Sequence, residues 1–233
     1  MLLYNPKDTL ISLHIPKSGG TSFDRVLKQW FGFGFYRHYY NHAKLKAPTK
    51  ASSGLFLKGL IPLCIHGHFD PGVDKVGVME YYPQAKQFIT LYRDPLELQL
   101  SFYFYQRKLI KDGSLFWNGV KVTDDSYLGK DVDEHLEEKS EYNWLRRFVP
   151  WELSLDNYKD IIENNFIHIG ITENLQQSID IFAEKLNKKT IHVPMENATL
   201  RKEIPSESSV KKFREKHQLE YAFYEYACNL NKK

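Results

Sequence analysis

A short run near the N-terminus combines one lysine with two glycines in a way that suits anion binding. It follows the apolar residues 9–15, and a helical pattern begins near Thr21. A strand, a glycine-rich turn and a helix N-terminus together present backbone N–H groups and partial positive charge to a phosphate. Lys17 stands before the glycines, whereas the common nucleoside-triphosphate loop, G-x-x-x-x-G-K-[ST], has its lysine after them. We therefore expect an anion site that differs from that loop, formed by Lys17, Ser18, Gly19, Gly20, Thr21 and Ser22.

A second cationic residue closes another apolar run in the middle of the chain. Residues 87–92 read as a buried strand that ends at Arg93, and Ser101 follows eight residues later, about two helical turns on. A guanidinium can bind a phosphate in a bidentate fork, and a hydroxyl can add a further hydrogen bond. The alternative is that Arg93 pairs with Asp94 or a helix carboxylate and that Ser101 is an ordinary surface serine.

Two histidines, His66 and His68, follow a third apolar run. Their separation places both imidazoles on one side of an extended segment. Histidine is well suited to accept a proton from a hydroxyl near neutral pH, so proton transfer stands beside a structural role in which the two histidines close a polar strand end. A metal site needs a third ligand, and none has an obvious spacing, so we expect no metal. Asp70 and Asp94 stay open as ligands at this stage.

The two anion-binding segments together resemble those of the sulfotransferases that use 3′-phosphoadenosine-5′-phosphosulfate (PAPS). Pro16-Lys-Ser-Gly-Gly-Thr-Ser22 resembles their 5′-phosphosulfate-binding loop, and the segment from Arg93 to Ser101 resembles their 3′-phosphate-binding segment, including its eight-residue spacing. The resemblance runs from about residue 9 to 105 and continues weakly through residues 169–174 and 193–199. It implies PAPS as the donor and 3′,5′-bisphosphoadenosine (PAP) as the product.

The His-Gly-His element resembles that of the heparan/uronyl 2-O-sulfotransferase branch. The resemblance implies that His68 is the catalytic base, that His66 assists it, and that Lys17 stabilises the charge on the leaving group. The acceptor would be a hydroxyl-bearing molecule, with a glycan favoured and a peptide tyrosine or a small molecule as alternatives. A kinase that uses ATP and a non-catalytic nucleotide-binding module are the two other classes that we consider.

The composition sets limits on partners and compartment. The chain has 32 Lys and Arg against 29 Asp and Glu, a net charge of +3, which gives little support for nucleic-acid binding. Cys64 and Cys228 lie far apart and suit structural thiols in a reducing compartment. The first apolar run is too short to cross a bilayer or to serve as a secretion signal. We therefore expect a cytoplasmic protein without a membrane anchor.

The predicted elements that hold these residues in place alternate between strand and helix. We predict strands over the apolar runs and helices over the periodic segments between them, at residues 9–15 (strand), 20–31 (helix), 60–66 and 87–92 (strands), 95–111, 131–148 and 156–164 (helices), 166–171 (strand), 172–187 and 206–230 (helices). The aromatic run 31–40 suits a strand or an extended loop. This pattern predicts a single α/β domain over residues 1–233, a P-loop-like three-layer fold with a central, mostly parallel sheet flanked by helices.

Ligands of such sheets bind at the carboxyl ends of the strands, where all of these motifs fall. We expect loops 36–54 and 112–130 to line the acceptor site, and the lysines of the first loop (Lys44, Lys46, Lys50) suit either an acidic glycan or ordinary solvation. The sequon at Asn197 reads as a structural or donor-side contact. His38 and His42 receive no role. The sequence does not indicate an oligomeric state.

Overall fold

A central sheet of five strands organises the molecule. The computed structural model of the chain describes residues 1–41, 44, 46–48, 61–70, 77–117, 119–140, 143–193 and 203–232. The strands lie in the order β2-β3-β1-β4-β7, and each neighbouring pair is parallel. Their bounds are β1 Leu10–Leu13, β2 Phe35–His38, β3 Cys64–Gly67, β4 Gln87–Tyr92 and β7 Phe166–Ile171.

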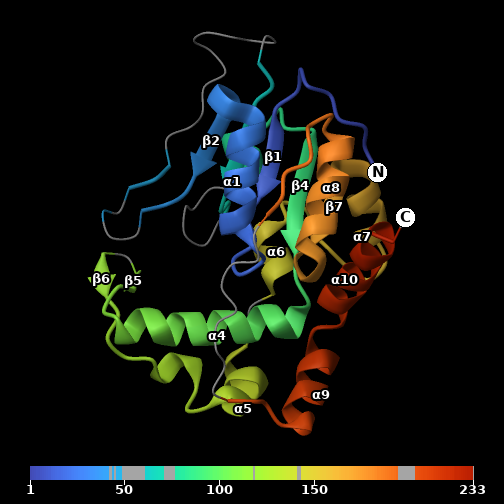
Figure 1. Cartoon of the computed structure of the whole chain (residues 1–233). Helices are drawn as coiled ribbons and strands as arrows, with labels where there is room; N and C mark the ends of the chain where they lie inside the picture. The colour runs from blue at the N-terminus through green and yellow to red at the C-terminus, as the bar shows by residue number, and fades with distance from the viewer. Residues whose placement is uncertain are drawn as a thin grey trace.

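Helices cover both faces of this sheet (Figure 1). One face packs on α1 (Gly20–Phe31) and α8 (Leu175–Lys185), through strand residues such as Leu10 and Ile89 and helix residues such as Phe23. The other face packs on α3 (Val78–Tyr81), α6 (Trp144–Phe148), α7 (Tyr158–Asn165) and α10 (Gln218–Leu230). Because successive strand residues point to opposite faces, a continuous apolar strand fills both layers. The predicted three-layer α/β fold is confirmed.

Helix α4 (Pro95–Lys111) runs across the carboxyl edge of the sheet, below the arrowheads in Figure 1. The Asp94 side chain caps it by accepting a hydrogen bond of 3.0 Å from the Glu97 amide, and Pro95 occupies its first turn. Its far side packs on α5 (Val132–Glu134), the π-helix η3 (His135–Lys139) and α9 (Glu207–Lys216). Helix α4 therefore covers the edge of the sheet where the strands have their carboxyl ends.

The strand at 87–92 and the helices at 20–31 and 95–111 are confirmed, and three predicted segments differ. The segment 131–148 forms three short helical pieces rather than one helix. The segment 206–230 breaks at His217, which leaves the helical conformation where its ring stacks on Phe213 and its Nδ1 contacts the buried Glu220. The loop 112–130 contains the two-stranded hairpin β5 (Phe116–Trp117) and β6 (Val120–Lys121) and the turn η2 (Ser126–Leu128).

Smaller deviations concern element ends. The predicted strand 60–66 is β3, which begins at Cys64, and the aromatic run supplies η1 (Gly32–Gly34) and β2. The helix predicted from residue 172 begins with the 3₁₀ turn η4 (Thr172–Asn174). The predictions for Lys50, His42 and the sequon at Asn197 fall outside the described residues. Within the described part of the chain, no helix combines the length and apolarity needed to cross a membrane.

Candidate functional site

The turn between β1 and α1 has an unusual backbone. Lys17 has a φ of 66° and Gly19 a φ of 77°, so two of its residues adopt the left-handed conformation. A non-glycine residue seldom does so, and such strain concentrates at ligand sites. Gly19 is the N-cap of α1, yet no side chain caps the helix and its first turn contains no acidic residue. The first amides of α1, on Gly20, Thr21 and Ser22, therefore lack partners within the helix.

Gly20 is required by a close approach of the His14 ring. A Cβ atom added at this position would lie 1.8 Å from His14 Nε2. Ser18, in the same turn, is 1% exposed, and its Oγ has no hydrogen-bond partner. Its amide donates to the Ile15 carbonyl at 3.3 Å, so this N–H is already engaged within the turn. A buried hydroxyl without a partner is uncommon and points to a ligand that completes it.

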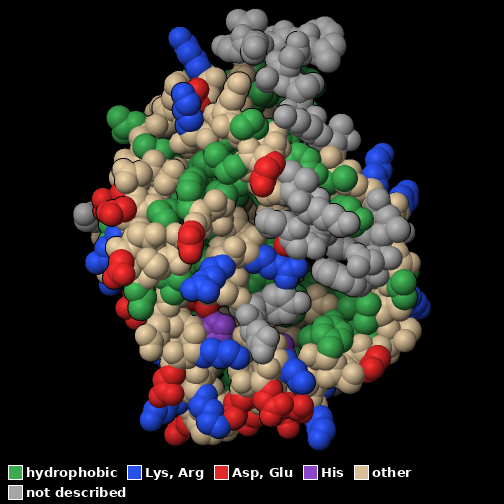
Figure 2. Space-filling view, turned by 180° about the vertical axis from the view of Figure 1, so that it is seen from behind, with side chains coloured by type: hydrophobic (Ala, Val, Ile, Leu, Met, Phe, Trp, Pro, Cys, Tyr) green, Lys and Arg blue, Asp and Glu red, His purple; other side chains and the backbone are tan. Residues whose placement is uncertain are grey.

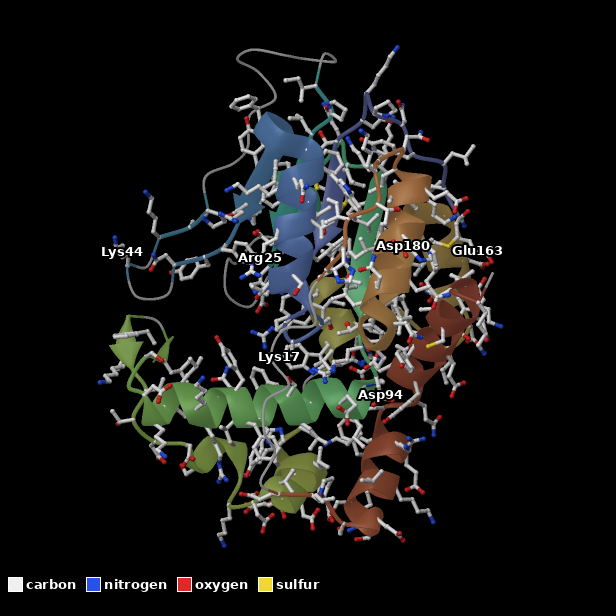
Figure 3. The ribbon with its side chains drawn as sticks, in the orientation of Figure 1. Lys17, Arg25, Lys44, Asp94, Glu163 and Asp180 are labelled. Atoms are coloured by element: carbon white, nitrogen blue, oxygen red, sulfur yellow. The ribbon has the colours of Figure 1, made fainter. Side chains whose placement is uncertain are left out.

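The Lys17 side chain extends from this turn toward α4 (Figure 3). Its Nζ lies 3.8 Å from the centroid of the Tyr105 ring, within the range of a cation–π contact. Burial, followed by the charges of Arg93 and Lys108, lowers the pKa of Lys17 to about 8. Lys17 therefore stays mostly protonated at neutral pH, in a locally cationic environment.

Arg93 connects this turn to the start of α4. Its Nη1 donates to the Lys17 carbonyl at 3.3 Å, its Nη2 lies 3.4 Å from Glu97 Oε2, and its Nε lies 3.7 Å from Glu173 Oε1. The pairing with a helix carboxylate that the sequence left open is thus present. These distances exceed those of strong charge-assisted hydrogen bonds, about 2.7–2.9 Å. Ser101, on α4, is 7% exposed and forms no side-chain hydrogen bond among the described residues.

The histidines form a stack beside the turn. The His14 ring lies between His68, at a centroid distance of 4.3 Å, and His66, at 5.1 Å, with nearly parallel planes in both pairs. His14 Nδ1 lies 2.8 Å from the Tyr39 hydroxyl. The register of β1 with β3 pairs Ser12 with His66. The side chains two residues further along, His14 and His68, therefore meet just beyond the sheet.

The hydrogen bond from His68 fixes its tautomer. His68 Nδ1 lies 2.7 Å from the His14 backbone carbonyl. A carbonyl oxygen can only accept, so Nδ1 carries the hydrogen, and the neutral ring has its lone pair on Nε2. The edge of the ring contacts Tyr39 and Phe148, at centroid distances of 5.0 and 5.8 Å. This arrangement suits a base that accepts a proton at Nε2.

His66 lies behind His14 and has no exposed surface. Its Nδ1 lies 2.8 Å from the Ser12 hydroxyl, while its Nε2 is buried without a partner. Burial lowers the pKa of His66 to about 4 and lowers that of His14 well below the usual histidine value. Both rings are therefore neutral at physiological pH. His66 stacks on His14, which in turn stacks on the predicted base.

Three residues of the site were missed by the sequence analysis: His14, Tyr39 and Tyr105. His14 stands just after β1 and two residues after Ser12, as His68 stands just after β3 and two residues after His66. That signal becomes visible only once β1 and β3 are known to be neighbours. Tyr105 stands one helical turn after Ser101, a spacing that the sequence does contain.

The candidate metal ligands are engaged in other contacts. Asp70 Oδ2 accepts from both Nε and Nη2 of Arg147 at 2.7 Å, and Asp94 caps α4. The described residues contain no group of three or more His, Cys, Asp or Glu arranged to hold a metal ion. Cys64 and Cys228 are free thiols. His38 is buried and stacks on Phe69.

Charge is mixed over the visible face. In Figure 2, lysine and arginine side chains are interspersed with acidic ones among the residues that the structure describes. The described side chains drawn there do not form the continuous basic surface that is typical of nucleic-acid binding.

Comparisons with known proteins find similarity among solved structures only. No family model matches the chain, and no curated protein matches its sequence. Among solved structures, the mouse sulfotransferase SULT7A1 complexed with PAP is similar, with 10% sequence identity and a TM-score of 0.41. The match covers 92% of this chain and 64% of that chain, so the present chain spans less than two thirds of that sulfotransferase's length.

Proposed function

We propose that this protein is a sulfotransferase that moves a sulfuryl group from PAPS to an acceptor hydroxyl on a carbohydrate. The observation that carries the proposal is the link between the two predicted anion sites. Arg93 Nη1 donates to the Lys17 carbonyl, so the two segments expected to bind the 3′-phosphate and the 5′-phosphosulfate are joined at the same edge of the sheet. A donor with phosphates at both positions requires such a pair.

The residues around the turn have the chemistry that this donor needs. The 5′-phosphosulfate would be held by the first amides of α1, by the Ser18 hydroxyl and by the Lys17 ammonium. The uncapped helix start and the unpartnered Ser18 Oγ are two independent signs of an anion site. The 3′-phosphate would be held by Arg93 and Ser101, with Glu97 and Glu173 orienting the guanidinium until the donor binds.

In the proposed reaction the acceptor oxygen attacks sulfur in line with the bridging oxygen that leaves. The acceptor O–H proton passes to His68 Nε2, an S–O bond forms to the acceptor, and the S–O bond to the 5′-phosphate breaks with its electron pair on PAP. Lys17 stabilises the charge that develops on that bridging oxygen. Catalysis then rests on positioning and on preorganised charge, as in phosphoryl transfer.

His14 and His66 support His68 without adding charge. The His14 carbonyl holds the tautomer that leaves Nε2 free of hydrogen, and the stacked rings of His14 and His66 fill the space behind it. Because both are held neutral by burial, neither repels the proton that His68 takes up.

The carbohydrate acceptor rests on the resemblance of the His-Gly-His element and on the surroundings of the site. Lys44 and Lys46 are exposed on the segment that follows β2, and Lys108 is exposed on α4 beyond Tyr105. Such cations suit an acceptor with carboxylate or sulfate groups, which a small neutral alcohol lacks.

A thermal-shift comparison tests the donor. PAP at a hundred times its Kd should stabilise the protein by about 2.7 kcal/mol, which raises the Tm by roughly 5–10 °C for a chain of this size. ATP with Mg²⁺ at the same concentration should raise it far less, because ATP has no 3′-phosphate for Arg93. A larger shift with ATP–Mg²⁺ would instead support a kinase, and no shift with either would contradict nucleotide binding.

A further inference from the structure

One face of α4 repeats a four-residue spacing from the end of β4 onward. Arg93 precedes the helix, and Glu97, Ser101 and Tyr105 follow at successive intervals of four. Residues spaced in this way lie above one another on the same side of a helix. The helix therefore places an aromatic ring one turn beyond the hydroxyl that we assign to the 3′-phosphate.

The Lys17 ammonium lies in an environment that disfavours its charge. It is desolvated, and Arg93 and Lys108 are both close enough to repel it. No carboxylate among the described residues forms an ion pair with Lys17. Within the described part of the chain, its Nζ makes one favourable electrostatic contact, with the face of the Tyr105 ring, 3.8 Å from the centroid. The negative face of an aromatic ring attracts a cation, and the attraction grows as water is removed.

The lysine is restrained at both ends. Its backbone is in the left-handed conformation, and its carbonyl accepts a hydrogen bond from Arg93 Nη1. Its far end meets Tyr105, which is 39% exposed and so keeps the ring accessible beside the opening of the turn. A lysine has four side-chain torsions, and without such a contact its ammonium would sample many positions.

We propose that Tyr105 is a positioning residue, whose ring holds the Lys17 ammonium above α4, in its charged form, ready to meet the leaving oxygen of the donor. The purpose of that placement rests on the proposed function, but the contact itself does not. The contact depends on the aromatic face, so phenylalanine at this position should preserve it and an aliphatic residue should not.

The test measures the protonation of Lys17 in the ligand-free protein. Wild type, Tyr105→Phe and Tyr105→Leu are labelled with acetic anhydride over a range of pH, and the modification of Lys17 is followed by peptide mass spectrometry. Only the neutral amine reacts, so the pH dependence of the rate reports the Lys17 pKa. We expect Tyr105→Leu to lower that pKa by about 0.5–1.5, which follows from the usual strength of a cation–π contact. Tyr105→Phe should stay within about 0.3 of wild type.

Tyr36→Leu is the matched control, because Tyr36 is 40% exposed and lies on β2, away from α4. It should leave the Lys17 pKa unchanged. The proposal is overturned if Tyr105→Leu leaves the Lys17 pKa at its wild-type value, or if Tyr105→Phe lowers it as far as Tyr105→Leu does. Thermal unfolding of each variant shows whether it is folded at the pH values used.

PAP binding gives a second readout that separates the two proposals. If PAP binds, Tyr105→Leu should shift the pH at which binding weakens downward by the same amount as the Lys17 pKa, and Tyr105→Phe should not. An unshifted binding profile in Tyr105→Leu would contradict the role in donor binding. If wild-type protein does not bind PAP at all, the proposed function fails, while the labelling experiment still decides whether Tyr105 holds the lysine.

Discussion

Two groups of basic residues lie at the same edge of the sheet, and burial leaves them in opposite charge states at neutral pH. Burial lowers the pKa of Lys17 to about 8, and it lowers the pKa of His66 to about 4 and that of His14 well below its usual value. A lysine begins near 10.5 and a histidine near 6.5, so the same physical effect leaves the lysine cationic and the imidazoles neutral at pH 7.

Under the proposed function, the difference divides the site into a part that would bind negative charge and a part that would accept a proton. Lys17, Arg93 and Lys108 concentrate positive charge between the turn and α4. The stacked histidines place no charge beside His68, whose tautomer the His14 carbonyl sets. Variants in the two parts should therefore fail in different measurements, one in donor binding and the other in turnover.

The largest effect is expected in the histidine part. His68→Ala should lower turnover by about 10²–10⁴-fold, because the acceptor hydroxyl loses its base. PAP affinity, measured by calorimetry, should stay within about twofold of wild type. His192→Ala removes an exposed histidine outside the stack and serves as the control. A normal rate in His68→Ala would exclude the proposed base.

The next largest effect is expected in the cationic part. Lys17→Met keeps the length of the side chain and removes its charge. Turnover should fall by about 10²–10³-fold, the usual cost of losing one electrostatic contact to developing charge. PAP affinity should fall as well, which separates this variant from His68→Ala. Equal PAP affinity in Lys17→Met and wild type would break the division between the two parts.

Arg93 should determine recognition of the 3′-phosphate. Arg93→Ala should weaken PAP binding by about 10–100-fold, since a hydrogen bond to a charged group contributes about 1.5–3 kcal/mol. Binding of adenosine 5′-monophosphate, which has no 3′-phosphate, should change little. Arg214→Ala, at an exposed position of α9, is the control. If both ligands lose affinity equally, Arg93 acts on the turn through the Lys17 carbonyl and not on the 3′-phosphate.

The packing between α1 and the histidine stack can be tested through stability. In Gly20→Ala the new methyl group would collide with His14 Nε2, and the ring would have to move. We expect the free energy of unfolding to fall by about 1–3 kcal/mol in urea denaturation. Gln29→Ala, at an exposed position of the same helix, should change it by less than about 0.5 kcal/mol. Wild-type stability in Gly20→Ala would mean that His14 does not fill this space.

The smallest expected effect is the pH dependence of donor binding. With a pKa of about 8, Lys17 loses its proton as the pH rises through 8, and a bound anion favours the charged form. PAP affinity should therefore fall by about tenfold between pH 7 and pH 9. Lys17→Met should lack this dependence. An affinity that is constant over this range in wild type would contradict the assigned role of Lys17.

Elements with strong local signals could be predicted from the sequence. Helix α1 begins at the glycine pair, with Gly19 as its N-cap. Helix α4 begins after Asp94, which caps it, and has Pro95 in its first turn. Strand β4 is a continuous apolar run and was predicted with its bounds. These signals act over a few residues and do not depend on the rest of the fold.

Features that depend on distant contacts could not be predicted. The helical spacing over 206–230 hides the break at His217, which is associated with a contact to buried Glu220. The histidine stack needs the parallel pairing of β1 with β3, two strands separated by some 50 residues of sequence. Lys17 meets Tyr105 only because α4 crosses the edge of the sheet.

The most direct test of the proposed function is the transfer of label from ³⁵S-PAPS to acceptors. Wild-type protein is incubated with labelled donor and a panel of acidic and neutral glycans, tyrosine peptides and small phenols, with His68→Ala in parallel. We predict that label moves to a hydroxyl of an acidic glycan, that one PAP is released for each group transferred, and that His68→Ala is nearly inactive. Tight PAP binding without transfer to any acceptor, or transfer that His68→Ala supports equally well, would contradict it.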